Sequence, residues 1–328
     1  MLLALDISNT NIKFGLYDHD VMKHRWVVST VRQRTTDEYA MVLSDLLRHV
    51  GYILTDIDDI IISSVVPPLT PVFEDLATRY CNLEALVVNH TLDLGIKLLV
   101  DNPWEVGSDR IMTIIAAHHL YGGPAIVIAF STATTFDVVS AEGDFLGGAI
   151  APGLSISAEA LSSSASQLYR VNMTPPRSAL GKNTIENMQS GIIYGHVGLV
   201  QGLIARISKE IPDVIHESEI KIIAHGGMAQ QMAPIIPEIQ YVNQYLPLEG
   251  LRLIHNRLRG PDSFEGKLFH NRVWWGDGNR HLPTILYKTS SKHRRSTKKI
   301  RQQLCCLIKK SGPSWTRTRD LSLIRTAL

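Results

Sequence analysis

The segments LLALDISNTNIKFGLYD at residues 2–18 and IVIAFSTATTFDVVSAE at residues 126–142 share one pattern. In each, an apolar run leads into a short polar turn, and a second run rich in apolar residues follows. This pattern predicts a β-hairpin with a Ser/Thr-rich bend, and its two copies indicate a duplicated domain. When the copies are aligned at Ser8 and Ser131, Ala129 stands where the first copy has Asp6.

The elements that follow the two hairpins repeat in order as well. In the first half we expect strands at residues 21–28, 60–66 and 84–89, helices at 37–50 and from Pro71, and a helix from Pro103 to the glycines at 122 and 123. In the second half we expect strands at 125–129, 135–140, 145–150 and 220–224, and helices from Ser155, over 183–207 and over 248–258. The sequence therefore predicts an α/β fold of two mixed sheets flanked by helices, with a ligand cleft between the halves.

The composition is that of a globular protein. The 328 residues are 45% hydrophobic and 20% charged, which suits two domains with sizeable cores. No run approaches the roughly 20 apolar residues that a membrane helix needs, and the first residues, MLLALD, do not resemble a secretory signal. The three cysteines form neither a disulfide framework nor a metal-ligand spacing, so we expect a cytoplasmic protein with no membrane partner.

Charge is divided unevenly along the chain. Residues 261–328 contain 15 Lys and Arg against 4 Asp and Glu, whereas residues 1–260 contain 18 against 27. An acidic folded body is therefore followed by a basic tail, which we place at residues 259–328 and expect to be disordered. A basic arm can bind nucleic acid, but this one has no recognisable motif for doing so. A readthrough or frameshifted end is the plainer hypothesis.

The first hairpin turn combines a carboxylate with many hydrogen-bond donors. Backbone N–H groups and hydroxyls in such a bend suit phosphate, and a neighbouring carboxylate suits magnesium. The alternative is an ordinary Asx or Ser turn that only closes the hairpin. A similar turn at residues 131–135 favours the functional interpretation, because two facing turns of this kind make a nucleotide cleft. The polar residues of the first turn are Asp6, Ser8, Asn9, Thr10, Asn11 and Lys13.

The segment EVGSDR places Asp109 and Arg110 near the start of an otherwise apolar helix. Asp109 could accept a proton from a hydroxyl, and Arg110 could hold a substrate carboxylate with two hydrogen bonds. The alternative for Asp109 is a first-turn acid that only favours the helix dipole. Both interpretations stay open at this point.

The helix expected at residues 183–207 carries glycines along one side. Each glycine costs about 1 kcal/mol of helix stability relative to alanine, so their spacing indicates close packing of another helix or subunit. Thr184 is expected at the N-cap or in the first turn, where capping and ligand binding are both open. The strand at residues 220–224 leads into HGG, where the backbone could approach a nucleotide closely. The glycines of the helix are Gly191, Gly195, Gly198 and Gly202.

Five segments together resemble the type III pantothenate kinases, in order and over residues 1–258. They are DISNTNIKFGLYD, NPWEVGSDRI, FSTATTFDVVSAEGDFLGGAIAPG, GKNTIENMQSG and LEGLRLI. The resemblance implies the fold shared by acetate and sugar kinases, heat-shock chaperone ATPases and actin, with two ribonuclease H-like halves at residues 1–118 and 119–258. It also implies a homodimer that phosphorylates pantothenate to 4'-phosphopantothenate with ATP, the first step of coenzyme A synthesis.

The resemblance also implies roles for individual residues. Asp109 would accept the proton of the pantothenate hydroxyl, Arg110 would bind the pantothenate carboxylate, and Thr132 would contact ATP. Thr184 would reach pantothenate across the dimer interface, and Val100 stands where many members have a Tyr that lines the substrate pocket. Further substrate contacts are expected at Gly107 and Ser108. ATP phosphates and Mg²⁺, the latter through Asp6, are expected at Asp6, Ile7, Ser8, Asn9, Thr10, Asn11, Ile12 and Lys13.

The sequence departs from the family pattern at four positions. Ser8 and Ser131 replace glycines of the two turns, His225 replaces a Thr before Gly-Gly, and Ala129 replaces an Asp. That Asp binds the monovalent cation, K⁺ or NH₄⁺, in the family, and alanine has no side-chain oxygen to offer. We therefore expect either an active kinase with an impaired cation site or a non-catalytic nucleotide-binding relative. An acetate or sugar kinase of the same fold is a third, weaker alternative.

Overall fold

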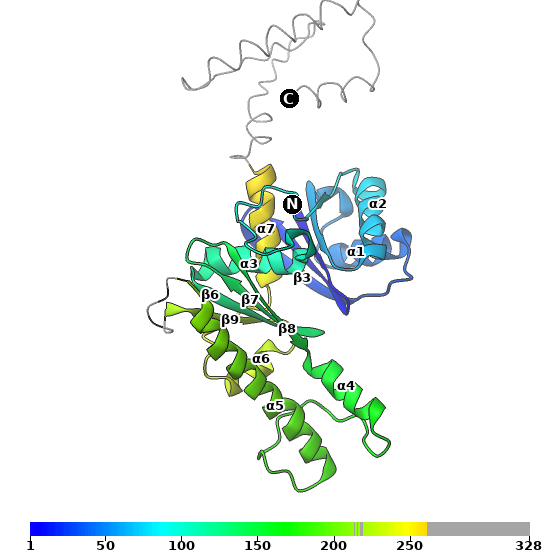
Figure 1. The fold of residues 1–328 in the computed structure, drawn as a ribbon. Coiled ribbons are helices and arrows are strands. Elements are labelled where there is room, and N and C mark those ends of the chain that lie inside the picture. The colour runs from blue at the N-terminus through cyan, green and yellow to red at the C-terminus, as the bar shows by residue number, and fades with distance from the viewer. Residues whose placement is uncertain (213, 215, 217–218, 261–328) are drawn as a thin grey trace, which may run out of the picture. The chain divides into compact units, whose positions relative to one another are not determined.

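A computed structural model describes residues 1–212, 214, 216 and 219–260 of the chain (Figure 1). The basic tail expected from residue 259 lies, from residue 261 onward, outside the described residues. Within the described part, no helix combines the length and apolar character needed to cross a membrane.

The first half is built on a five-stranded mixed sheet. Its strands are β1 (Leu2–Ile7), β2 (Asn11–Asp18), β3 (Val21–Ser29), β4 (Asp59–Ser64) and β5 (Leu86–Val87), in the spatial order β3-β2-β1-β4-β5. Strand β1 pairs antiparallel with β2 and parallel with β4. Helix α1 (Thr36–His49) follows β3, and α2 (Thr70–Cys81) follows β4. The N-terminus of α1 has a capping box formed by Thr35 and Glu38.

The second half repeats this sheet. Its strands are β6 (Ala125–Phe130), β7 (Ala133–Val139), β8 (Phe145–Pro152), β9 (Lys221–His225) and β10 (Tyr241–Val242), in the order β10-β9-β6-β7-β8. Strand β6 pairs antiparallel with β7 and parallel with β9, as β1 does with β2 and β4. The identical order and directions confirm the α/β fold of two ribonuclease H-like halves.

Alternation along β1 divides its side chains between two cores. Leu3, Leu5 and Ile7 are buried in a cluster with residues of α1 and α2. Leu2 and Ala4 point to the opposite face and join a second cluster. The sheet is therefore covered on both faces, which explains why β1 is apolar at almost every position.

Two helices lie between the sheets, namely α3 (Ser108–Tyr121) and α7 (Leu246–Arg259) (Figure 1). Ile111 of α3 packs with Leu251 and Ile254 of α7 in the cluster that covers β1. Ile114 and Ala117, further along α3, pack in another cluster that covers β6 and β9. The start of α3 is therefore held between the two halves, and the last helix of the described chain packs on the first sheet.

The prediction of one continuous helix from Pro103 was wrong. Pro103–Glu105 form a separate 3-10 turn, Val106 is extended, and Gly107 is the N-cap of α3. Proline suits the first turn of any helical segment, so Pro103 marked the short turn and not the helix. As a result, Asp109 lies in the first turn of α3.

The outer face of the second sheet is covered by the remaining helices. These are α4 (Leu154–Ser164), α5 (Thr184–Ile207) and the short α6 (Ala229–Met232). Met188, Ile193 and Val200 of α5 pack in one cluster with Ile126 and Ile128 of β6. The long helix expected at residues 183–207 is thus present, with Asn183 as its N-cap and Thr184 as its first residue.

Candidate active site

Asp6 and Ala129 occupy equivalent places in the two sheets. Each is the residue before the last of its strand, β1 or β6. Each also lies two residues after a side chain that packs toward α3 and α7, and therefore points to the same face of its strand. That side chain is Ala4 in the first sheet and Val127 in the second. Both side chains therefore point to the inner side of their sheets, where α3 begins. The duplicated site has a carboxylate on one side only.

Asp6 is almost completely buried, with 2% of its surface exposed. Its carboxylate accepts a hydrogen bond from Ser8 Oγ at 3.0 Å and pairs with Lys13 Nζ at 2.9 Å. Lys13 lies directly across from Asp6 in the register of β1 and β2. The buried carboxylate is therefore hydrogen-bonded and ion-paired within the first hairpin, as a buried polar group needs to be.

The two hairpin turns meet at their tips. Thr10 Oγ1 lies 3.0 Å from Thr132 Oγ1, and both residues are exposed. The serines of these turns cause no backbone strain, because neither Ser8 nor Ser131 has a positive φ. Ser131 Oγ donates to the carbonyl of Ala133 at 3.0 Å. The polar turns expected to hold phosphate are thus brought together from the two halves.

Asp109 lies in the first turn of α3 near Asp6. Burial raises the pKa of the Asp109 carboxyl above its ordinary value, and the negative charge of Asp6 raises it further, while the N–H of Arg110, 2.9 Å away, acts in the opposite direction. A Cβ on Gly107 would lie only 2.5 Å from Asp109 Oδ1, so glycine leaves the room that the carboxylate uses. Ser108 Oγ accepts from Ser63 Oγ of β4 at 2.8 Å and fixes this helix start.

Arg110 is held against the second sheet. Its Nε donates to Asp137 Oδ1 at 2.5 Å, and its guanidinium carbon lies 5.1 Å from the centre of the Phe145 ring. Asp137 is 1% exposed, and burial raises the pKa of this carboxyl to about 6 even though Arg110 opposes the shift. Among the described residues, the recorded ion pair engages only Nε, which leaves the two Nη groups for another acceptor.

Val100 lies near the same strand as Arg110. A Cβ built on Gly147 of β8 would lie 3.9 Å from Val100 Cγ1, and one built on Gly148 would lie 3.1 Å from Arg110 Nη2. No role was predicted for these two glycines, although GG in the middle of a strand is a signal of close approach. The fold therefore brings Val100 and Arg110 to one patch of β8.

His225 is the last residue of β9 and lies beside Ala129 in the register of β9 and β6. It is 8% exposed, and neither Nδ1 nor Nε2 has a hydrogen-bond partner. Burial lowers the pKa of the imidazole to about 3, with a further contribution from the positive charge of Lys13. The sequence identified His225 only as a departure from the family, without a role.

The residues at the two strand ends differ in how well they fit cations. Mg²⁺ is commonly held by one or two carboxylates together with substrate phosphates, and Asp6 fits that mode. Among the described residues, no group of three or more His, Cys, Asp and Glu could hold a metal without a substrate. The expected monovalent cation does not fit at Ala129, because a methyl side chain provides no ligand and the facing His225 provides nitrogen instead of oxygen.

Thr184 is the one predicted site residue that lies far from this cluster within the chain. It is exposed at the start of α5, the end of that helix that points away from the sheets (Figure 1). The chain folds all other predicted residues around the two hairpin turns and the start of α3.

The family model for type III pantothenate kinase matches residues 2–206. The chain belongs to the type III pantothenate kinases. A member from Roseiflexus sp. (strain RS-1) is 47% identical over 259 residues, which cover 79% of this chain and 100% of the relative. Another, from Geobacter sp. (strain M21), is 46% identical, with 78% of this chain and 99% of the relative covered. Membership of the type III pantothenate kinases makes the chain a kinase that uses ATP.

The fold also agrees with a distant solved structure. A protein of the Baf family from Campylobacter jejuni superposes with a TM-score of 0.51 at 17% identity, over 77% of this chain and 97% of that one. At this identity the likeness concerns the fold alone. The assignment to the type III pantothenate kinases rests on the family model and the sequence relatives.

Proposed function

We propose that this chain transfers the γ-phosphate of ATP to the primary hydroxyl of pantothenate, forming 4'-phosphopantothenate, the first intermediate on the way to coenzyme A. The observation that carries the proposal is the carboxylate of Asp109, held at the start of α3 close to Asp6 and with a raised pKa. Such a carboxylate can act as a general base, which removes the proton of an acceptor hydroxyl as the hydroxyl attacks a phosphate. The family's own name supplies the acceptor.

The ATP side of the site consists of the two hairpin turns. Residues Asp6 to Lys13 and Thr132 supply backbone N–H groups, hydroxyls and the Lys13 ammonium to the phosphates. Asp6 would hold Mg²⁺ together with phosphate oxygens, and the ion would neutralise charge on the phosphates. Catalysis of phosphoryl transfer depends mainly on positioning and charge. The contact between Thr10 and Thr132 supports a phosphate site shared by both halves.

The acceptor side consists of the start of α3 and the middle of β8. Asp109 accepts the hydroxyl proton as the oxygen attacks the γ-phosphorus and ADP leaves, and its raised pKa makes it a stronger base than an ordinary aspartate. The Nη groups of Arg110 bind the pantothenate carboxylate, while Asp137 keeps the guanidinium oriented. Gly107, Ser108 and Val100 complete this side.

Pantothenate distinguishes this proposal from its alternatives. Incubation of the full chain with ATP and Mg²⁺ should give 4'-phosphopantothenate, identified by ³¹P NMR and mass spectrometry, and no acetyl phosphate or sugar phosphate. Pantothenol, which has the hydroxyl but not the carboxylate, should be a much poorer acceptor because Arg110 loses its ligand. Transfer to acetate or a hexose, or no transfer to any acceptor, would refute the proposal. The comparisons give no support to a catalytically impaired relative.

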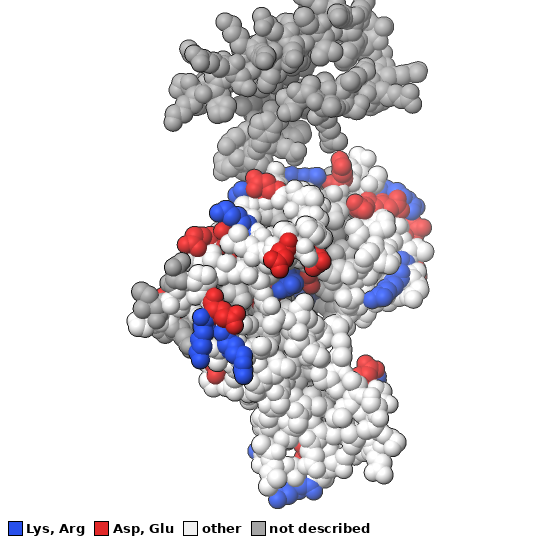
Figure 2. Space-filling view, in the orientation of Figure 1, with Lys and Arg blue, Asp and Glu red and all other residues white. Residues whose placement is uncertain are grey.

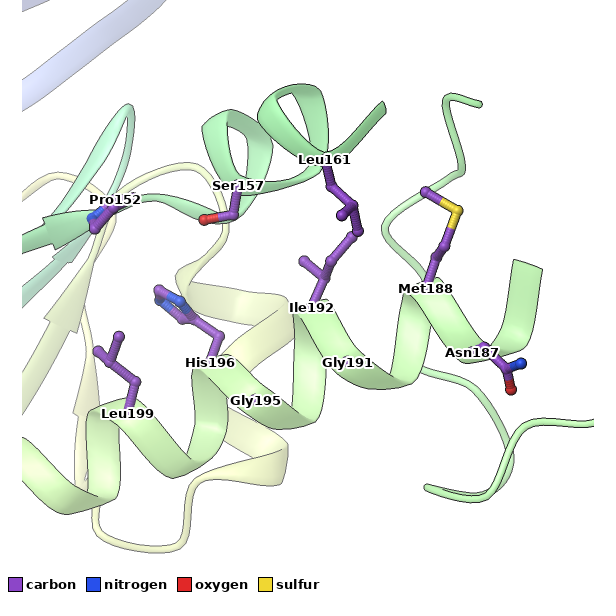
Figure 3. A pocket seen from close by; sticks show the side chains of 10 residues that line it. All are labelled: Pro152, Ser157, Leu161, Asn187, Met188, Gly191, Ile192, Gly195, His196 and Leu199. Carbon is purple, nitrogen blue, oxygen red and sulfur yellow. The ribbon is translucent and has the colours of Figure 1, made fainter. Parts of the chain in front are cut away.

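A homodimer through α4 and α5 is part of the proposal. Gly191, Gly195 and Gly198 are exposed on one side of α5, and a Cβ on any of them would meet nothing within 4 Å. A groove of about 410 Å³ lies between α4 and α5, lined mainly by apolar side chains that include Leu161 and Ile192 (Figure 3). Figure 2 shows few charged side chains over these two helices on the face in view.

The exposed apolar residues favour a second copy as the partner of this surface. Ile156 and Leu161 on α4 and Ile185 on α5 are 43%, 39% and 43% exposed. The glycines of α5 let a second helix approach closely, and these large apolar side chains would be buried against it. Thr184 stands at the end of this surface, and its proposed role is to contact pantothenate bound in the partner subunit. We also propose a cytoplasmic location, in line with three cysteines that form no disulfide framework.

A further inference from the structure

His225 holds an imidazole whose two nitrogens are buried and unused. The residue is 8% exposed, and neither Nδ1 nor Nε2 has a partner among the described residues. Buried polar groups of folded proteins are nearly always hydrogen-bonded, so each exception calls for an explanation. A neutral imidazole has one N–H donor, and leaving it unpaired in the interior is costly.

The direction of His225 follows from the alternation along β9. Ile223, two residues earlier, packs on the α3 side of the second sheet, whereas Ala224 packs on the opposite side. His225 shares the side of Ile223, which is also the side of Ala129 in the neighbouring strand. The imidazole therefore points toward the inner side of the sheet ends, and Lys13 of the first hairpin is near enough to affect its charge.

The turn beyond His225 is closely packed at Gly226 and open at Gly227. Gly226 has φ +96°, and a Cβ there would lie 2.4 Å from the carbonyl oxygen of Phe130. Gly227 has nothing within 4 Å of its Cβ position, so its backbone borders open space. Ala129 leaves more room than any acidic side chain at that position. A ligand that approaches the turn at Ser131 therefore comes close to the strand end that holds His225, and a small displacement of this turn would expose the enclosed ring nitrogens.

We propose that His225 donates a ring N–H to a phosphate oxygen of the bound nucleotide, in the space left by Ala129. The inference rests on the proposed function, because it takes the nucleotide to lie between the hairpin turns. Ala129 and His225 act together in it, since the small residue admits the phosphate and the imidazole binds it. Because neither side chain offers an oxygen to a monovalent cation, nucleotide binding does not depend on potassium.

Calorimetric titration of the full chain with ADP and Mg²⁺ measures this contact without turnover. His225→Ala should lower ADP affinity by about tenfold or more, as expected for loss of a hydrogen bond to a charged group. His225→Gln and His225→Asn place an amide N–H near the former Nε2 and Nδ1, and the one that restores affinity identifies the donor nitrogen. His118→Gln is the matched control, because His118 bonds to the carbonyl of Ala141 and takes no part in the site. It should bind ADP as the parent does.

Nitrogen-15 NMR of the histidine rings gives a readout that a merely structural role would not move. On addition of ADP, one ring nitrogen of His225 should shift as its N–H gains an acceptor. The ADP affinity of the parent should also be equal in potassium chloride and in choline chloride at the same ionic strength. A strong gain in potassium would mean that a cation site persists, and it would overturn the proposal.

Failure of the inference and failure of the proposed function give different results. If the parent binds ADP and phosphorylates pantothenate, but His225→Ala binds ADP equally well and the ring signals do not shift, the inference alone is wrong. If the parent neither binds ADP nor phosphorylates pantothenate, both are wrong.

Discussion

Thr10 and Thr132 touch across the two halves of the molecule, with their Oγ1 atoms 3.0 Å apart although 122 residues separate them in the chain. Each hydroxyl stands at the tip of a hairpin turn, and the two turns are equivalent in the duplicated fold. The contact shows that the two equivalent turns lie together and form one site between them, not two separate sites. It also marks the place where phosphate would be held from both sides.

Loss of the Thr132 hydroxyl should weaken ATP binding. One hydrogen bond to a charged phosphate contributes about 1.5–3 kcal/mol, so Thr132→Ala should raise the dissociation constant for ATP by about tenfold or more, with the KM for pantothenate little changed. Thr78→Ala on α2 is the control, because its hydroxyl only bonds to the carbonyl of Glu74 in its own helix. Equal ATP affinity in the two variants would contradict the role of Thr132.

The acidic limb of the pH–rate profile should report the Asp6 charge. Asp109 acts as a base only when it is deprotonated, and its pKa lies above its ordinary value because of burial and Asp6. Activity should therefore fall as pH drops through this raised pKa. Asp6→Asn removes a negative charge, lowers the pKa of Asp109 and should move the limb to lower pH, whatever happens to the maximal rate. An unmoved limb would show that the two carboxylates do not interact.

The Arg110–Asp137 pair should contribute more to the free energy of unfolding at high pH than at low pH. Arg110→Met leaves Asp137 buried without its cation and with only the Thr135 hydroxyl as a partner. Its folded-state pKa, about 6 in the parent, therefore rises further above the value in the unfolded chain. A carboxyl whose pKa is raised in the folded chain favours folding at low pH, where it is protonated, and this contribution is lost as pH rises. Urea unfolding should therefore show a destabilisation of about 3–5 kcal/mol at pH 8 and less at pH 5.

Removal of both charges provides the comparison for that experiment. Arg110→Met with Asp137→Leu leaves no unpaired buried charge, so stability at pH 8 should largely recover while activity stays lost. A double variant as unstable as Arg110→Met would mean that packing, and not charge, explains the loss.

A charge in the groove between α4 and α5 should separate the dimer. Leu161→Glu places a carboxylate among apolar side chains that line the groove and should give a monomer by sedimentation velocity, with reduced pantothenate affinity because Thr184 no longer reaches the partner site. Met41→Glu is the matched control, since Met41 on α1 is 59% exposed and lies in the other half. A monomeric parent, or a dimeric Leu161→Glu, would exclude this interface.

The repeated hairpins made most of the fold predictable. Apolar runs separated by polar turns are local signals, and they located the strands of both sheets to within a few residues, except the short edge strand β10, which was not located. The start of α3 was mispredicted because Pro103 suits a short 3-10 turn as well as a helix, and the N-cap Gly107 carries no capping side chain. Local signals therefore located the elements better than their ends.

The interior of the site was less predictable. Asp109 and Arg110 could be chosen from EVGSDR, but Asp137 could not be assigned to Arg110, because the pairing depends on how α3 crosses β7. The unpaired state of His225 is likewise a property of the packed fold. A sequence shows which groups are present, and only the packing shows which of them have partners.

The most direct test of the whole account is the rate of pantothenate phosphorylation by Asp109→Asn. Asparagine keeps the size of the side chain and an oxygen for the N–H of Arg110, so folding and ADP affinity should be preserved. Loss of the general base should lower kcat by about 10²–10⁴-fold. A variant that folds, binds ADP and phosphorylates pantothenate at nearly the parental rate would contradict the assignment of Asp109 as the catalytic base.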